Sequence, residues 1–160
     1  MKTVHKGFTL IELLIVVAII SALAAFIVLT PISTTKKARD ARRMSDLQQY
    51  HAAMEAYANK NGGFYLARTS ANDASGNTVC GTAGMNLSSC PEDSQSPASG
   101  YRYRYQTRDG ANGSASATEF VFWTRIESRS GTNYLVVCST GRSGISSAIP
   151  TSGICPATLN

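Results

Sequence analysis

A single carboxylate, Glu12, lies inside the most apolar part of the chain. From Phe8 to Leu29 the sequence reads FTLIELLIVVAIISALAAFIVL, and its polar residues are Thr9, Glu12 and Ser21. An ionised carboxylate in an apolar medium costs at least about 2.5 kcal/mol on insertion scales, so such a residue usually has a function and a partner. The alternative is a glutamate near a helix start that the helix dipole favours and that reaches the interface. The chemistry expected of Glu12 is charge pairing.

No other set of residues indicates catalysis or metal binding. His51 has no second histidine near it, and the chain contains neither a Gly-x-Ser-x-Gly elbow nor a phosphate-binding loop. The closely spaced cysteine pairs that are typical of metal sites are also missing from the sequence. We therefore expect no enzymatic activity, no cofactor and no metal site.

Four cysteines in the second half of the chain predict two disulfides. They are Cys80, Cys90, Cys138 and Cys155, and they lie in polar, Gly/Ser-rich surroundings. Disulfides are typical of small exported domains. Four cysteines allow three connectivities, among which the sequence does not choose rigorously. Loop-closure entropy favours the local pairs Cys80–Cys90 and Cys138–Cys155.

A run of basic residues follows the apolar segment. It comprises Lys36, Lys37, Arg39, Arg42 and Arg43. One interpretation is contact with anionic lipid headgroups. The alternative is a solvated helical face in which Asp40 and Asp46 are the local partners. The formal net charge of +5 is too small to indicate nucleic acid by itself, so DNA binding at this run stays open without being indicated.

The elements that must position these residues begin with a long helix. Residues 8–29 span roughly 33 Å in helical conformation, which is enough for a bilayer core. Pro31 interrupts the run, and a renewed helix then finds a cap among residues 33–35. We expect residues 8–60 to form one long helix, bent near Pro31, that ends at Asn61-Gly62-Gly63. Its second half carries an apolar stripe formed by Leu47, Tyr50, Met54 and Tyr57 and extended by Ala38, Ala41 and Met44.

Three β-rich runs separated by glycine-containing turn signals follow, at residues 101–105, 120–126 and 134–138. They predict an antiparallel meander that packs on the apolar stripe, because three strands alone bury too little surface. The predicted fold is therefore α+β, with a long N-terminal helix on a small antiparallel sheet of about three strands.

Period-two alternation assigns the side chains of these strands to faces. The tyrosines at 101, 103 and 105 share one face and are expected in the core. The alternative is that they stack on nucleic acid bases while Arg102 and Arg104 reach phosphates, although alternation puts these arginines on the other face. Phe120, Phe122 and Ile126 are expected in the core. Trp123 points the other way, which makes it a candidate for a subunit contact or for burial under the tail 139–160, which Cys155 would hold.

The stretch Lys6-Gly7-Phe8-Thr9-Leu10-Ile11-Glu12-Leu13-Leu14 resembles the N-terminus of type IV prepilins and type II secretion pseudopilins. In that family a prepilin peptidase cuts after the glycine and the new N-terminal residue is methylated on its amine. The resemblance implies cleavage between Gly7 and Phe8, N-methylation of Phe8, and pairing of Glu12 with the Phe8 amine of a neighbouring subunit.

The second part of the chain is most similar to the major pseudopilin branch, through Ala41-Arg42-Arg43-x-x-Asp46-Leu47 and Cys90-Pro91-Glu92-Asp93. That branch commonly has Asp-Pro before its first strand, and some members bind calcium in a C-terminal loop. Here the order is Pro-Glu-Asp and the tail has no acidic cluster, so the resemblance carries no calcium site over. Four cysteines and a Cys-anchored tail favour pilins of surface fibres instead.

The expected organisation is a leader peptide at 1–7, a transmembrane and assembly helix at 8–30, an amphipathic helix at 31–60 and a β-rich head at 61–160. Counting positive charges would place the head in the cytoplasm. The resemblance and the expected disulfides place it outside the inner membrane, before assembly into an extracellular pilus or a periplasmic pseudopilus.

The resulting hypothesis is a structural subunit of a type IV pilus or pilus-like filament. The alternative is the major pseudopilin of a type II secretion system. A monomeric membrane-anchored binding protein would leave Gly7, Phe8 and Glu12 unexplained together. The expected partners are further copies of the chain in a helical filament, the prepilin peptidase/methyltransferase, the membrane and the assembly platform.

Overall fold

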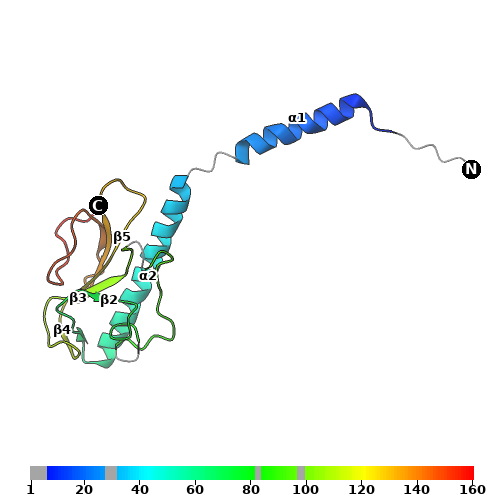
Figure 1. Cartoon of the computed structure of the whole chain (residues 1–160). Helices are drawn as coiled ribbons and strands as arrows, with labels where there is room; N and C mark the ends of the chain where they lie inside the picture. The colour runs from blue at the N-terminus through cyan, green and yellow to red at the C-terminus, as the bar shows by residue number, and fades with distance from the viewer. Residues whose placement is uncertain (1–6, 28–31, 82–83, 97–99) are drawn as a thin grey trace, which may run out of the picture. The chain divides into compact units, whose positions relative to one another are not determined.

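The computed structural model describes residues 7–27, 32–81, 84–96 and 100–160 of the 160-residue chain (Figure 1). It divides into two compact units, residues 1–35 and 36–160. In chain order the elements are α1 (Leu10–Ile27), α2 (Ile32–Lys60), β1 (Tyr65–Leu66), β2 (Asn72–Asp73), β3 (Arg104–Thr107), β4 (Ala115–Ala117), β5 (Phe120–Arg125), β6 (Tyr134–Cys138) and β7 (Ser143–Ser146).

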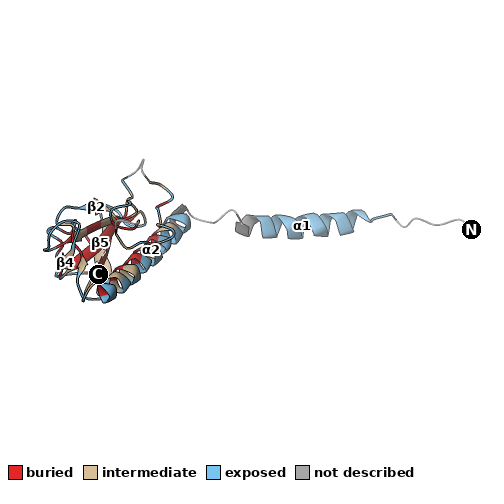
Figure 2. Ribbon diagram, turned by 90° about the horizontal axis from the view of Figure 1, so that it is seen from below, coloured by how far each residue is buried: buried red, intermediate tan, exposed pale blue. Residues whose placement is uncertain are grey.

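Helix α1 is apolar on all sides, and its described side chains are exposed along its length (Figure 2). Within the described ranges, no helix has both the length and the hydropathy that crossing a membrane requires. The predicted segment 8–30 and the predicted bend near Pro31 extend into residues 28–31, which lie outside the described residues.

Helix α2 buries one stripe and exposes the opposite face (Figure 2). Leu47, Tyr50 and Met54 are fully buried, as the apolar spacing predicts. The predicted extension of the stripe through Ala38 and Ala41 is wrong, because both alanines are exposed. The charged residues Asp40 and Arg43 occupy the buried positions there.

The sheet of the head is larger than the predicted meander. Five strands pair antiparallel in the order β2-β3-β5-β6-β7, and β1 and β4 form a separate two-stranded sheet. The three central strands correspond to the predicted runs, so the α+β fold is confirmed. The first run is shifted, since β3 covers Arg104–Thr107 instead of 101–105.

The inner face of this sheet packs on α2 to form the main core. The ring of Tyr50 stacks on Phe122 with centroids 5.6 Å apart, and Tyr105 lies 4.7 Å from Phe122. Tyr103 and Tyr105 are buried, which confirms core packing for these two tyrosines and leaves them unavailable for base stacking. Tyr101 precedes the strand and is only partly buried.

The outer face of the sheet is covered in part by the tail. Trp123 is only 3% exposed, in a second cluster with Val121, Val136 and Cys138 that Cys155 and Leu159 cover. Gly153 packs so tightly that a Cβ there would lie 2.0 Å from the carbonyl carbon of Thr107. Further along, Asn160 exchanges two backbone hydrogen bonds with Ile145 of β7, at 2.9 and 3.0 Å. Trp123 therefore lies under the tail, as one of its two predictions states.

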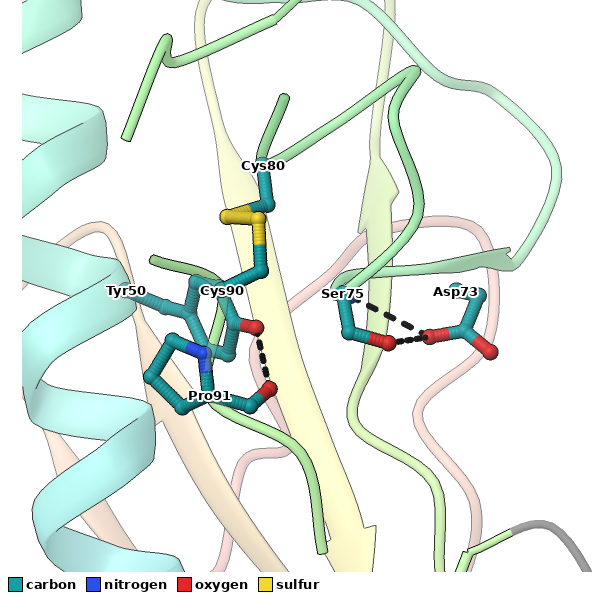
Figure 3. Close-up of a disulfide and its surroundings, with 6 residues drawn as sticks. All are labelled: Tyr50, Asp73, Ser75, Cys80, Cys90 and Pro91. Atoms are coloured by element: carbon teal, nitrogen blue, oxygen red, sulfur yellow. Dashed lines mark hydrogen bonds between the residues drawn. A yellow bond between two sulfur atoms is a disulfide. The ribbon is translucent and has the colours of Figure 1, made fainter. Parts of the chain in front are cut away.

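Two disulfides lie on opposite faces of the sheet. Cys80 pairs with Cys90 at the main core, and Cys138 pairs with Cys155 under the tail. These are the local pairs that loop-closure entropy favours. Figure 3 shows the first disulfide beside Pro91, whose carbonyl accepts a 2.6 Å hydrogen bond from the Tyr50 hydroxyl. Helix α2 is thereby tied to the segment that follows Cys90.

Candidate assembly site

The predicted cleavage position lies just before α1. Gly7 and Phe8 have no regular secondary structure, and Phe8 is 86% exposed. An added Cβ at Gly7 would meet no atom within 4 Å. The fold of the free chain therefore does not require glycine at position 7, and a requirement for it would come from a protein that binds this segment.

Glu12 closes the first turn of α1 through a capping box. Its Oε2 atom accepts hydrogen bonds from the backbone N–H of Thr9 at 2.9 Å and from the Thr9 hydroxyl at 2.7 Å. The Glu12 N–H in turn donates to Thr9 Oγ1 at 3.3 Å. This reciprocal pattern satisfies backbone donors that would otherwise lack partners at a helix start.

The second carboxylate oxygen of Glu12, Oε1, makes no hydrogen bond within the described residues. One carboxylate can therefore cap its own helix and still accept a hydrogen bond from a cation of another molecule. The sequence predicted a partner for Glu12 without predicting the cap, although the Thr-x-x-Glu spacing is a signal that could have revealed it.

Comparison with known families identifies this segment. Residues 2–28 match the family model described as the prokaryotic N-terminal methylation motif. The chain carries the signature of type IV pilins and pseudopilins. Neither the curated proteins nor the solved structures give a match to it. The pilin signature ends at residue 28, and the pilin-like character of the remainder rests on its fold, in which helices precede a small antiparallel sheet.

The basic run at residues 36–43 is divided into buried and exposed members. The Arg43 side chain is only 1% exposed and contacts three carboxylates, which belong to Asp40 at 2.7 Å, Glu127 at 2.6 Å and Asp93. Its guanidinium also lies over the ring of Tyr101, 4.4 Å from the centroid. We call Asp40, Arg43, Asp93 and Glu127 the Arg43 cluster.

The contacts of the Arg43 cluster differ from the predicted role of Arg43 at lipid headgroups. Arg43 has almost no surface left for a lipid, because its guanidinium neutralises buried acids of the head. Arg39 donates two hydrogen bonds to Glu127, at 2.9 and 2.6 Å, so it too is engaged within the head. The predicted members that remain exposed are Lys36, Lys37 and Arg42.

A sequence signal for the buried arginine existed in the helical spacing. Arg43 lies four residues before Leu47 and therefore continues the buried stripe of α2 toward the N-terminus. Its partner Asp93 is 50 residues away in the sequence, and no local pattern links the two. The arginine could therefore have been placed on the buried face, but its partners could not have been named.

The described part of the chain contains no group of three or more His, Cys, Asp or Glu side chains placed to hold a metal ion. His51 packs 5.5 Å from the ring of Phe120 and 3.8 Å from a carboxylate oxygen of Glu55. These contacts are those of a helix residue beside the core. Within the described residues, Glu12 Oε1 thus remains an acceptor that another molecule can use.

Proposed function

We propose that this chain is a prepilin, the precursor of a structural subunit of a type IV pilus or pilus-like filament, and not an enzyme. The observation that carries the proposal is the methylation motif followed by a helix whose large apolar side chains are exposed. Apolar surface of this extent marks a site of membrane or protein contact. The large exposed side chains of α1 are Leu10, Ile11, Leu13, Leu14, Ile15, Val16, Val17, Ile19, Ile20 and Leu23.

In this proposal the same segment lies first in the membrane and then between subunits of the filament. Residues 8–30 hold the subunit in the inner membrane with the head outside, and then pack against the same segment of other subunits. Cleavage after Gly7 creates the Phe8 amine. Glu12 Oε1 then accepts a hydrogen bond from the Phe8 amine of a neighbouring subunit. This ion pair neutralises two charges within an apolar bundle.

A secretion pseudopilin is the second candidate function. The features that support it are the Ala41-Arg42-Arg43 and Cys90-Pro91 patterns shared with that branch. Two disulfides and a tail fastened by Cys155 support the surface fibre. Electron micrographs of cells that express the chain decide between the two, because a pilus gives long surface fibres and a secretion pseudopilus does not.

Processing tests the proposal directly. In a bacterium with a prepilin peptidase, mass spectrometry of the membrane-associated protein should give a mature chain that begins at N-methylated Phe8. Gly7→Val should accumulate as uncut precursor with a normally folded head, because an added Cβ at Gly7 would meet no atom of the described residues within 4 Å. Thr3→Val, a change elsewhere in the leader, is the matched control and should be cut normally. A mature chain that begins near Ala25 would contradict the proposal, since it would indicate an ordinary signal peptide.

A further inference from the structure

The outer face of the sheet contains a groove that the tail leaves open. It has a volume of about 260 Å³, and its wall includes Arg102, Arg104, Arg125, Trp123, Tyr134 and Ile149. We call it the arginine groove. Neither filament assembly through α1 nor processing at Gly7 uses it, so it calls for a separate explanation.

The register of the sheet places arginine residues opposite aromatic residues along this groove. Arg104 of β3 lies opposite Trp123 of β5, and Arg125 of β5 lies opposite Tyr134 of β6. Directly opposite side chains on one face of an antiparallel pair are close neighbours. Because Trp123 and Arg125 are two residues apart on one strand, both pairs lie on the outer face.

Several donors of the arginine groove have no acidic partner. Within the described residues, the guanidinium of Arg104 makes no hydrogen bond or ion pair, and that of Arg125 contacts only the ring of Tyr101, at 5.5 Å. The hydroxyl of Tyr134 likewise makes no hydrogen bond there. Arg102 is paired with Asp73 at 3.1 Å, but its side chain is still 39% exposed. The groove therefore attracts anions.

The acidic residues of the head do not offer a matching surface on a second copy. Its carboxylates bind arginines, hydroxyls or backbone N–H groups of their own chain, as Glu119 binds Arg108 and Asp109 binds Thr118. Among the described residues of the head, Glu92 is the one carboxylate without a hydrogen bond or ion pair. A ligand that fills the arginine groove must bring its own repeated negative charge.

We propose that the arginine groove binds single-stranded nucleic acid. Its unpaired guanidiniums would contact successive phosphates, and Tyr134 and Ile149 would contact the bases. A single strand carries both features, since an anionic backbone alternates with flat, uncharged rings that stack on apolar and aromatic side chains. An acidic polysaccharide carries the charge without such rings, and a duplex hides its bases from side chains in a groove.

The test measures binding of a fluorescent 12-nucleotide oligo-dT to the full chain in neutral detergent by fluorescence anisotropy at several salt concentrations. Arg104→Gln/Arg125→Gln should weaken binding at least tenfold. The slope of log binding constant against log salt concentration should also become shallower by about 1.4, because each lost single-strand phosphate contact removes about 0.7 from it. Tyr134→Ala should weaken binding severalfold at an unchanged salt slope. Arg129→Gln is the matched control, since Arg129 is exposed, lies outside the groove and makes no ion pair in the described residues.

Three results would overturn the proposal. An equal loss of affinity in Arg129→Gln and in the groove variant would show attraction by net charge alone. Equal affinity for polygalacturonate of matched charge would show a site for any polyanion. Tighter binding of the duplex than of the single strand would show that bases play no part. Circular dichroism of each variant checks that the head is folded, so a loss of binding is attributed to the groove.

Discussion

At the residue scale, Glu12 has one observed role and one proposed role, and removal of its whole carboxylate would abolish both together. The carboxylate caps the start of α1 through Thr9, and in the proposed filament it pairs with an amine of another subunit. Glutamine is compatible with a capping box because its carbonyl oxygen accepts the same hydrogen bond. Glutamine carries no charge, so it separates helix capping from charge pairing.

The first prediction uses this separation. Glu12→Gln should give few or no filaments at a normal membrane level of subunit, because an unpaired ammonium in an apolar bundle costs several kcal/mol. Thr9→Ala removes the two hydrogen bonds that involve the Thr9 hydroxyl and keeps the charge of Glu12, so it should assemble with a modest loss of yield. Filament yield by shearing and electron microscopy is the measurement. If Glu12→Gln assembles normally while Thr9→Ala fails, capping is the role of Glu12 and the pairing model is wrong.

The second prediction concerns the Arg43 cluster in acid. Hydrogen bonds from Arg39 lower the pKa of Glu127 from 4.5 to about 2, and burial opposes this without reversing it. A carboxyl group with a depressed folded-state pKa stabilises the head fully above the unfolded pKa and loses this contribution as the pH falls toward the folded value. The free energy of unfolding should therefore decrease between about pH 5 and pH 2.

Urea unfolding of the oxidised protein at several pH values measures this dependence. Glu127→Gln should be less stable than the original chain at pH 7 and should lose less stability on acidification. Glu92→Gln, which changes a carboxylate without a partner, is the control and should keep the original profile. Parallel profiles for the chain and Glu127→Gln would contradict the assignment of this pH dependence to Glu127.

At the scale of elements, the tail depends on one close approach to the sheet. Gly153 has φ +64°, and an added Cβ would lie 2.0 Å from the Thr107 carbonyl carbon and 2.2 Å from the Arg108 nitrogen. Both atoms belong to the backbone, so the tail and not a side chain must move. Gly141 has a similar φ of +78° with nothing within 4 Å of an added Cβ.

The third prediction compares these two glycines. Gly141→Ala should destabilise the head by about 1–2 kcal/mol, the usual penalty of the left-handed conformation. Gly153→Ala should destabilise it further and lift the tail from Trp123, the one tryptophan of the chain. The measurement is urea unfolding together with the emission maximum of Trp123, which should shift to the red in Gly153→Ala only. Equal stabilities and equal spectra would contradict the packing seen at Gly153.

The elements differ in how far local sequence could predict them. Strands β5 and β6 have long alternating or β-branched runs, and they form at the predicted positions. Strands β1, β2 and β7 are only two to four residues long and partly polar. Their formation depends on pairing with neighbouring strands more than on their own β-propensity. The same limit applies to sites, since Gly7, Phe8 and Glu12 form a local motif, whereas the partners of Arg43 come together only in the fold.

On the scale of the whole molecule, the two disulfides stabilise different layers of the head. Cys80–Cys90 adjoins the main core beneath α2, and Cys138–Cys155 fastens the tail over the outer face. Removal of either disulfide should raise the conformational entropy of the unfolded chain by a similar amount. Their structural consequences should nevertheless differ, because Trp123 lies under the second disulfide.

The fourth prediction is that the paired serine variants differ in spectrum more than in stability. Cys80→Ser/Cys90→Ser and Cys138→Ser/Cys155→Ser should each lose about 3 kcal/mol of unfolding free energy in the loop-entropy model. Only the second variant should shift Trp123 emission to the red under native conditions. A red shift in the first variant alone would contradict the layered arrangement.

The backbone pairing of Asn160 with Ile145 has a consequence for heads held close together. An open strand edge offers unpaired N–H and C=O groups to any other edge, and this risk of intermolecular strand pairing rises with local concentration. In the five-stranded sheet, one edge is β2, which has two residues, and the other is β7, whose outer side is occupied at Ile145 by Asn160. In the proposed filament, such heads would thus be protected against amyloid-like fusion of neighbouring sheets.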